Sequence, residues 1–207
     1  MFLVDDHRLV RAGVRGLLAG AGALAVVGEA ASCEEACRIV GTLEPDVIVL
    51  DISLPGVTGI EAITRLHRIA PDARILVLTM HEMDPVLKLA LGQGASGYLS
   101  KRSAPQDLVT AVREVAAGRI YLEAGLAQAI VDQPKDEQTQ GIGSLAPREF
   151  EVFVLLARGR SVKEVADALP LSPKTIHSHR ASVLLKLGVH SSAELVQVAV
   201  QAGIVEP

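Results

Sequence analysis

The sequence predicts a doubly wound α/β domain with a five-stranded parallel sheet, followed by a small all-α domain of four helices. Short apolar runs alternate with helical patterns before residue 120, which is typical of a parallel sheet covered by helices on both faces. No strand pattern follows residue 145. A polar stretch between the two parts, QPKDEQTQGIG at 133–143, has too little apolar surface to order itself and indicates a linker.

The first part contains five strand-like runs that are apolar on both faces. They lie at 2–4, 25–27, 47–50, 75–78 and 98–99. Helical patterns between and after them predict helices near 7–19, 33–42, 59–69, 84–92 and 105–117. Asp84 with Pro85 and, later, Pro105 are typical of helix starts, and Gly118 follows the end of the last helix. Alternation of this kind predicts the doubly wound sheet.

The second part contains four short helical segments with recognisable starts. Pro147 occupies the first turn of the first helix, Ser161 caps the second, and Ser191 begins the fourth. The third helix runs over 173–187. Because a short turn at 170–171 joins the second helix to the third, the pair is a helix-turn-helix candidate.

Composition excludes several classes of protein. Apolar residues make up 49% of the chain and charged residues 21%, which predicts a folded core rather than disorder. Aromatic residues are only 2%, so a stacking platform for single-stranded nucleic acid is not expected. Apolar runs are too short for a membrane span, and the early acidic pair leaves no room for a secretory signal, so we expect a cytoplasmic protein. Cys33 and Cys37 lie four residues apart in a predicted helix and are expected to be ordinary thiols.

Polar side chains follow four of the predicted strands. Asp5 and Asp6 follow the first strand, Asp51 the third, Thr79 the fourth and Lys101 the fifth. Ligands of open parallel sheets bind at the carboxyl ends of the strands, where these side chains converge. Because three carboxylates close together repel one another, we expect a Mg²⁺ ion to bind them. Each residue alone is compatible with a helix cap or a surface group, but the combination predicts phosphoryl transfer to a carboxylate nucleophile.

Residues 1 to about 120 resemble the receiver domain of two-component response regulators. The resemblance lies in four motifs: VDDH at 4–7, VLDISLPGVTGIE at 49–61, LTM at 78–80 and GYLSK at 97–101. It implies a flavodoxin-like receiver over residues 1–122 and, after it, a short helix and flexible linker over 123–144.

The same resemblance implies a role for each residue of the pocket. Asp51 is the expected phosphoacceptor, Thr79 and Lys101 are expected to contact the phosphoryl group, and Tyr98 is the expected aromatic switch. Mg²⁺ is expected to bind three carboxylates and one backbone carbonyl, those of Asp5, Asp6, Asp51 and Ser53. His7 lies next to the acidic pair and receives no role.

Residues 145–207 resemble the LuxR/NarL-type helix-turn-helix domain, across LAPREFEVFVLLARGRSVKEVADALPLSPKTIHSHRASVLLKLGVHS. Residues 145–189 carry seven basic side chains and four acidic ones, which suits the phosphates of DNA. The third helix is expected to enter the major groove. By the resemblance, bases would face His177, Ser178 and Ala181, and phosphates would contact Lys163, Lys174, Thr175 and Arg180. Ala146 stands where the family commonly has a capping Thr.

The two resemblances together imply a transcription regulator of the NarL/FixJ type. Its expected partners are a sensor histidine kinase, double-stranded DNA and a second copy of the chain when phosphorylated or bound to DNA. Its chemistry would be limited to its own phosphorylation and dephosphorylation. Two alternatives remain open. A haloacid-dehalogenase-type phosphohydrolase would need a second Asp at Ser53, and a DNA-binding protein controlled by other ligands would not need the complete pocket.

Overall fold

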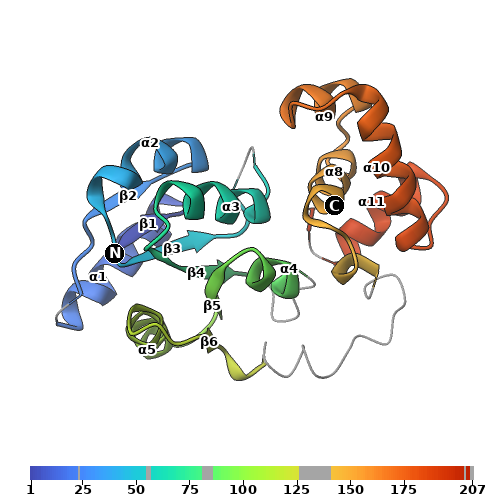
Figure 1. Cartoon of the computed structure of the whole chain (residues 1–207). Helices are drawn as coiled ribbons and strands as arrows, with labels where there is room; N and C mark the ends of the chain where they lie inside the picture. The colour runs from blue at the N-terminus through green and yellow to red at the C-terminus, as the bar shows by residue number, and fades with distance from the viewer. Residues whose placement is uncertain (23, 55–56, 81–85, 126–140, 203, 206–207) are drawn as a thin grey trace. The chain divides into compact units, whose positions relative to one another are not determined.

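A computed structural model describes residues 1–22, 24–54, 57–80, 86–125, 141–202 and 204–205 (Figure 1). The chain divides into two compact units, one built around a sheet and the other of helices. Most of the predicted linker lies outside the described residues. Among the helices described, none is both long and apolar enough to cross a membrane.

The first unit contains a parallel sheet with the strand order β2-β1-β3-β4-β5-β6. The doubly wound α/β class predicted from the sequence is confirmed. The strands are β1 (Phe2–Val4), β2 (Gly28–Ala30), β3 (Val47–Asp51), β4 (Arg74–Thr79), β5 (Ala95–Ser100) and β6 (Tyr121–Leu122).

Three strands differ from the prediction. β5 spans Ala95–Ser100, whereas only residues 98–99 were predicted, because Ser96 and Gly97 interrupt its apolar run. β2 begins at Gly28 rather than at residue 25, because its partner β1 begins at Phe2 and the register places Phe2 opposite Gly28. β6 is a sixth strand that the sequence analysis missed, and it pairs in parallel with Gly97 and Tyr98 of β5. Two residues are too few to produce a periodic pattern, which explains why β6 was missed.

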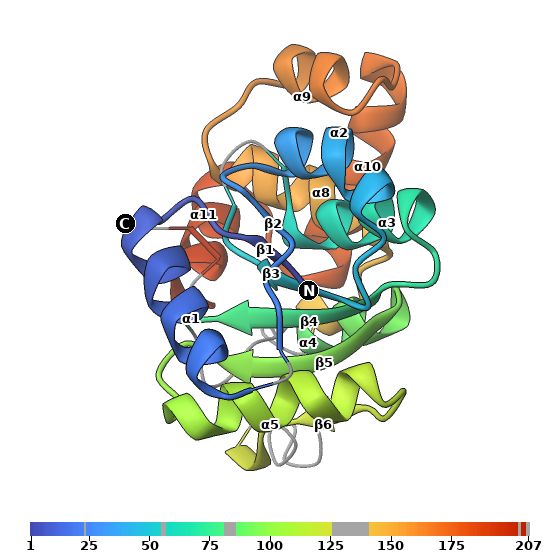
Figure 2. The same cartoon turned by 90° about the vertical axis from the view of Figure 1, so that its left-hand side faces the viewer.

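Helices cover both faces of the sheet. The helices are α1 (Arg8–Gly20), α2 (Cys33–Leu43), α3 (Gly59–Ile69), α4 (Leu87–Gly92) and α5 (Pro105–Ala116). α1 and α5 lie on one side of the sheet, and α2 and α3 lie on the other (Figure 1). Figure 2 shows β4 and β5 side by side with α5 along them. The start of the fourth helix predicted at Asp84 and Pro85 lies outside the described residues.

An aliphatic core joins the sheet to α1 and α5. Leu18 of α1 and Val112 of α5 pack with Leu3, Val49 and Leu76 of the strands, and all five are buried. Burial of each such side chain contributes about 1.5–3 kcal/mol, so this core holds the strand ends that carry the polar residues.

The second unit contains the four predicted helices. They are α8 (Pro147–Ala157), α9 (Val162–Ala168), α10 (Pro173–Lys186) and α11 (Ser192–Gln201). The hydroxyl oxygens of Ser161, Ser172 and Ser191 each accept a hydrogen bond from a backbone N–H of the first turn, as their cap positions predict.

Residues before α8 also belong to the packed part of this unit. Ile142 is fully buried, and a Cβ at Gly141 would lie 2.5 Å from the carbonyl oxygen of Lys186. The domain limits at 122 and 145 stay predictions, and these contacts lead us to propose that the second domain begins at residue 141.

Candidate functional site

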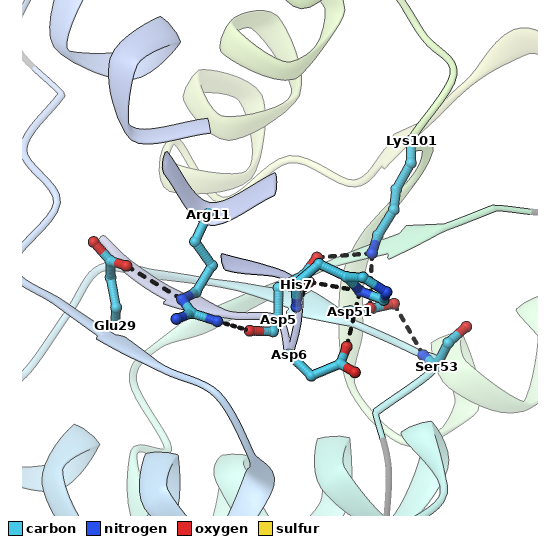
Figure 3. A network of polar contacts seen from close by, with 8 residues as sticks. All are labelled: Asp5, Asp6, His7, Arg11, Glu29, Asp51, Ser53 and Lys101. Carbon is cyan, nitrogen blue, oxygen red and sulfur yellow. Dashed lines mark hydrogen bonds and ion pairs between the residues drawn. The ribbon is translucent and has the colours of Figure 1, made fainter. Parts of the chain in front are cut away.

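Side chains from several strand ends meet at the carboxyl edge of the sheet (Figure 3). β1 and β3 are neighbours, so Asp5, directly after β1, lies near Asp51, the last residue of β3. Lys101 follows β5, and its ammonium Nζ donates to Asp5 Oδ2 and to Asp51 Oδ2, both at 2.7 Å. The structure therefore brings together three of the residues predicted from motifs far apart in the sequence.

Burial and charge both act on this group. The side chains of Lys101, Asp5 and Asp51 are 9%, 6% and 0% exposed. Burial raises the pKa of Asp51, while the hydrogen bonds from Lys101 and from Ser53 N–H act in the opposite direction. Burial alone would lower the pKa of Lys101, but its hydrogen bonds to Asp5 and Asp51 outweigh that effect and raise it. Lys101 is thus the positive charge that makes two buried carboxylates tolerable.

The backbone orients the Asp51 carboxylate. Ser53 N–H donates to Asp51 Oδ1 at 3.0 Å, and Lys101 holds the other oxygen. Both oxygens of Asp51 therefore have a hydrogen-bond donor, which limits rotation of the carboxylate. This contact uses the Ser53 amide, and the predicted metal contact of the Ser53 carbonyl stays a prediction.

Asp5 is held by the segment that follows it. His7 N–H donates to Asp5 Oδ1 at 2.7 Å, and the Arg11 guanidinium donates to the Asp5 carbonyl oxygen. Arg11 Nε also donates to Glu29 Oε2 at 3.3 Å, which ties the start of α1 to β2. Figure 3 shows these contacts as one connected polar network.

Asp6 and His7 complete a cluster of possible metal ligands. His7 Nδ1 lies 3.0 Å from Asp6 Oδ1 and 3.3 Å from Asp5 Oδ1. One ligand atom from each of Asp5, Asp6, His7 and Asp51 lies within 4.8 Å of the others. Three carboxylates in this space are the hard oxygen donors that Mg²⁺ prefers, so the residues present fit that ion. The sequence placed His7 beside the pocket without a role, because sequence position alone does not reveal where a histidine ring points.

Thr79 and Tyr98 lie on the strands beside the acidic group. Thr79 is the last residue of β4 and is fully buried, and its carbonyl oxygen accepts a hydrogen bond of 2.6 Å from Lys101 N–H. Tyr98 lies on β5 and its side chain is fully buried. Their predicted roles, as phosphoryl contact and switch, stay predictions.

The two cysteines lie on α2, outside this cluster. Their Sγ atoms are 3.9 Å apart, and burial together with the neighbouring Cys37 raises the pKa of Cys33 to about 12. A thiol with so high a pKa is a poor nucleophile, in line with the expectation of ordinary thiols.

The predicted DNA-contacting residues are on α9 and α10. Ile176 and Val183 on α10 are buried, as is its C-cap residue Leu187. Lys163, Lys174, His177, Ser178 and Ala181 are exposed, whereas Thr175 and Arg180 are half-buried. The Arg180 guanidinium donates to Ser192 Oγ at 3.1 Å, at the start of α11, so this residue also joins two helices.

Glu149 forms one half of a capping box at the start of α8, where Ala146 has no capping side chain. Its carboxylate accepts hydrogen bonds from Ala146 N–H at 2.7 Å, Ser182 Oγ at 2.6 Å and Lys186 Nζ at 2.6 Å. Burial opposes ionisation, but hydrogen bonds from Lys186, Ser182 and Ala146 prevail and lower the pKa of Glu149 to about 2. One carboxylate thus satisfies the start of α8 and ties it to α10.

Both units match known families. Residues 1–113 match the model of the response regulator receiver domain, and residues 143–199 match that of bacterial regulatory proteins of the luxR family. The chain belongs to the response regulators.

Relatives of this response regulator match it along nearly its whole length. It is 38% identical to the response regulator UvrY of Escherichia coli K12 over 206 residues, which covers 99% of this chain and 94% of UvrY. It is 35% identical over 209 residues to the response regulator GacA of Pseudomonas aeruginosa, covering 100% of this chain and 97% of GacA. A structure of RcsB from Salmonella enterica serovar Typhimurium, bound to promoter rprA with the phosphomimetic BeF₃⁻, matches with a TM-score of 0.77 and 30% identity, covering 95% of this chain and 96% of RcsB.

Gly59 of this response regulator positions the loop after Asp51. A Cβ at Gly59 would lie 2.6 Å from the Ile52 carbonyl oxygen and would overlap the Ile52 side chain. We expect Gly59→Ala to displace Ile52 and Ser53, to cost about 1–3 kcal/mol, and to speed hydrogen exchange in β3. Gly13→Ala is the control, because a Cβ there meets nothing within 4 Å and should stabilise α1. Equal exchange of β3 in the two variants would contradict this prediction.

Glu149→Gln tests the hydrogen-bond network around the Glu149 carboxylate. Because the pKa of Glu149 is lowered to about 2, its contribution to stability is present above its ordinary pKa of 4.5 and is lost as the pH falls toward 2. At pH 7 the variant should lose about 1.5–3 kcal/mol, measured by hydrogen exchange of α8 and α10 in the full chain. Below pH 4.5, the difference in unfolding free energy between the variant and the parent should become smaller. Asp167→Asn, an exposed change on α9, is the control; a loss of the same size there would contradict the prediction.

Proposed function

We propose that this response regulator accepts a phosphoryl group on Asp51 in a Mg²⁺-dependent reaction, and that phosphorylation controls its dimerisation and DNA binding and thereby transcription. The observation that carries the proposal is the buried Asp51 carboxylate. It is bonded by Lys101 Nζ and Ser53 N–H, and it shares its pocket with Asp5 and Asp6.

Asp51 is the nucleophile of the proposed reaction. One of its carboxylate oxygens bonds to the phosphorus of a phosphohistidine on a sensor histidine kinase, while the phosphorus–nitrogen bond of the donor breaks. The electron pair of that bond stays on the leaving imidazole nitrogen, which takes up a proton. Burial favours the reaction because few waters compete with Asp51 for the phosphorus.

The acidic residues would hold the metal ion. Asp5, Asp6, Asp51 and the Ser53 carbonyl are the proposed Mg²⁺ ligands. A bound Mg²⁺ supplies positive charge that offsets the repulsion between Asp51 and the phosphoryl oxygens. Lys101 already lies 2.7 Å from Asp51 Oδ2 and would move its hydrogen bonds to the phosphoryl oxygens.

Two residues next to the pocket would transmit the change. Thr79 would contact the phosphoryl group, and Tyr98, which is buried here, would act as the aromatic switch whose inward position is coupled to the movement of Thr79. Lys101 would bond Asp5 and Asp51 before phosphorylation and the phosphoryl oxygens after it. This difference would supply the free energy that shifts the population from the inactive to the active conformation. Apart from its own phosphorylation and dephosphorylation, the protein would catalyse no reaction.

The second domain would bind double-stranded DNA as a dimer. His177, Ser178 and Ala181 of α10 would face bases, and Lys163, Lys174, Thr175 and Arg180 would contact phosphates. The exposure of most of these side chains supports this role, as does the structural match to RcsB on a promoter. A regulator of chromosomal DNA would act in the cytoplasm.

The proposal is tested on the full chain with Mg²⁺ and acetyl phosphate. We expect a gain of about 80 Da, abolished by EDTA, and conversion of residue 51 to homoserine after borohydride reduction of the acyl phosphate. Fragments selected by the protein from a random double-stranded pool should then bind about tenfold tighter after phosphorylation. Phosphorylation without any change in DNA affinity or dimerisation would overturn the control step. DNA binding without uptake by any donor would favour control by another ligand.

A further inference from the structure

His7 has a conformation that its position in the fold does not explain. It is the residue before α1, where a polar side chain commonly caps the helix, yet its side chain makes no capping hydrogen bond. Its ring is 64% exposed, and Nδ1 nevertheless lies 3.0 Å from Asp6 Oδ1 and 3.3 Å from Asp5 Oδ1. Figure 3 shows the ring over the acidic residues.

The backbone that carries the ring is held in place. His7 N–H donates to Asp5 Oδ1 at 2.7 Å, and the Asp5 carbonyl accepts from Arg11 on the first turn of α1. Asp5 is itself held by Lys101. The imidazole is therefore attached to a segment that is fixed on both sides, and its nitrogen belongs to the same 4.8 Å cluster as the three carboxylates.

We propose that His7 Nδ1 is an additional metal ligand of this pocket and that it raises the affinity for first-row transition-metal ions relative to the affinity for Mg²⁺. The inference rests on the proposed function, since it concerns the ion of the same site. Carboxylate oxygens accept Mg²⁺ and transition metals alike, but an imidazole nitrogen strongly favours the latter. An imidazole nitrogen in the ligand set, beside the carboxylates of Asp5, Asp6 and Asp51, would change the relative affinities for these metal ions while the number of carboxylates stays the same.

A different role for His7 predicts the opposite result. If the ring only formed an ion pair with Asp5 and Asp6, it would compete with every metal ion for those two carboxylates. Removing it would then strengthen the binding of Mg²⁺ and of transition metals together. The sign of the change in His7→Gln therefore distinguishes a ligand from a competing charge.

The experiment is isothermal titration of the full chain with Co²⁺ and, separately, with Mg²⁺. We expect His7→Gln to weaken Co²⁺ binding by about tenfold or more while Mg²⁺ affinity changes less than about twofold. His67→Gln, a change of an exposed histidine on α3, is the control and should leave both affinities as in the parent. Hyperfine-shifted imidazole ring protons should appear in the NMR spectrum of the Co²⁺-loaded parent and of His67→Gln, and should be absent from His7→Gln.

Several outcomes would overturn the role of His7. An unchanged ratio of Co²⁺ to Mg²⁺ affinity in His7→Gln would do so, as would stronger binding of both ions. If the parent still gains a phosphoryl group with Mg²⁺ in that case, the proposed function stands alone. If the parent neither binds Mg²⁺ nor gains the group, the proposed function fails, and the loss or retention of Co²⁺ binding in His7→Gln still decides the role of His7.

Discussion

Asp51→Asn is expected to take up no phosphoryl group under conditions in which the parent is modified. An amide oxygen is a far weaker nucleophile than a carboxylate, and no other acidic residue of the pocket is held by both Lys101 and the Ser53 amide. Intact mass after incubation with Mg²⁺ and acetyl phosphate should show the gain of about 80 Da in the parent only.

The fold should survive this substitution. Burial raises the pKa of Asp51, so its charged form is costly in the folded protein and removing the charge costs little. Asp46→Asn is the matched control, because Asp46 is exposed at the opposite end of β3. A phosphoryl group on Asp51→Asn, or its loss from Asp46→Asn, would contradict Asp51 as the acceptor.

Lys101→Met should slow phosphorylation by about 100-fold or more, since removing one preorganised donor at a developing charge commonly costs this much. In the parent, Lys101 Nζ lies 2.7 Å from Asp51 Oδ2 and is almost fully buried, so little water could replace it. Methionine keeps much of the length and packing of the side chain but has no charge. The rate is measured as the time course of the mass gain with acetyl phosphate.

The same substitution should strengthen Mg²⁺ binding. Without the ammonium group, Asp5 and Asp51 lose their shared positive charge and attract a divalent cation more strongly. Lys88→Met, a change of an exposed lysine on α4, controls for the loss of one charge from the surface. A rate within about threefold of the parent, or weaker Mg²⁺ binding, would count against a direct role for Lys101.

Comparing individual strands and helices shows where sequence patterns were sufficient to predict their limits. The buried strands β3 and β4 were predicted to within one residue at each end, because both faces are covered and the apolar runs are continuous. β2 was placed three residues early, since its apolar run precedes the residues that pair with β1. α3 has the limits predicted from its helical pattern, and the structure shows that the Thr58 side chain caps it by accepting from Glu61 N–H.

The sequence by itself determined that this chain has a parallel α/β receiver, a helical second domain and polar residues at the strand ends. Strand and helix periodicity are local, and parallel strands end at a common edge, so Asp5, Asp51 and Lys101 could be assigned to one place.

Only the tertiary structure decided how those groups interact. Lys101 is 96 residues from Asp5, and its simultaneous contact with Asp5 and Asp51 depends on the strand order β1-β3-β4-β5. The direction of the His7 ring toward the neighbouring Asp5 and Asp6 depends on its side-chain rotamer. The bonds of Glu149 to Ser182 and Lys186 depend on the packing of α8 against α10. Neither a side-chain rotamer nor a contact between residues distant in the sequence produces a periodic pattern, so the sequence alone did not reveal them.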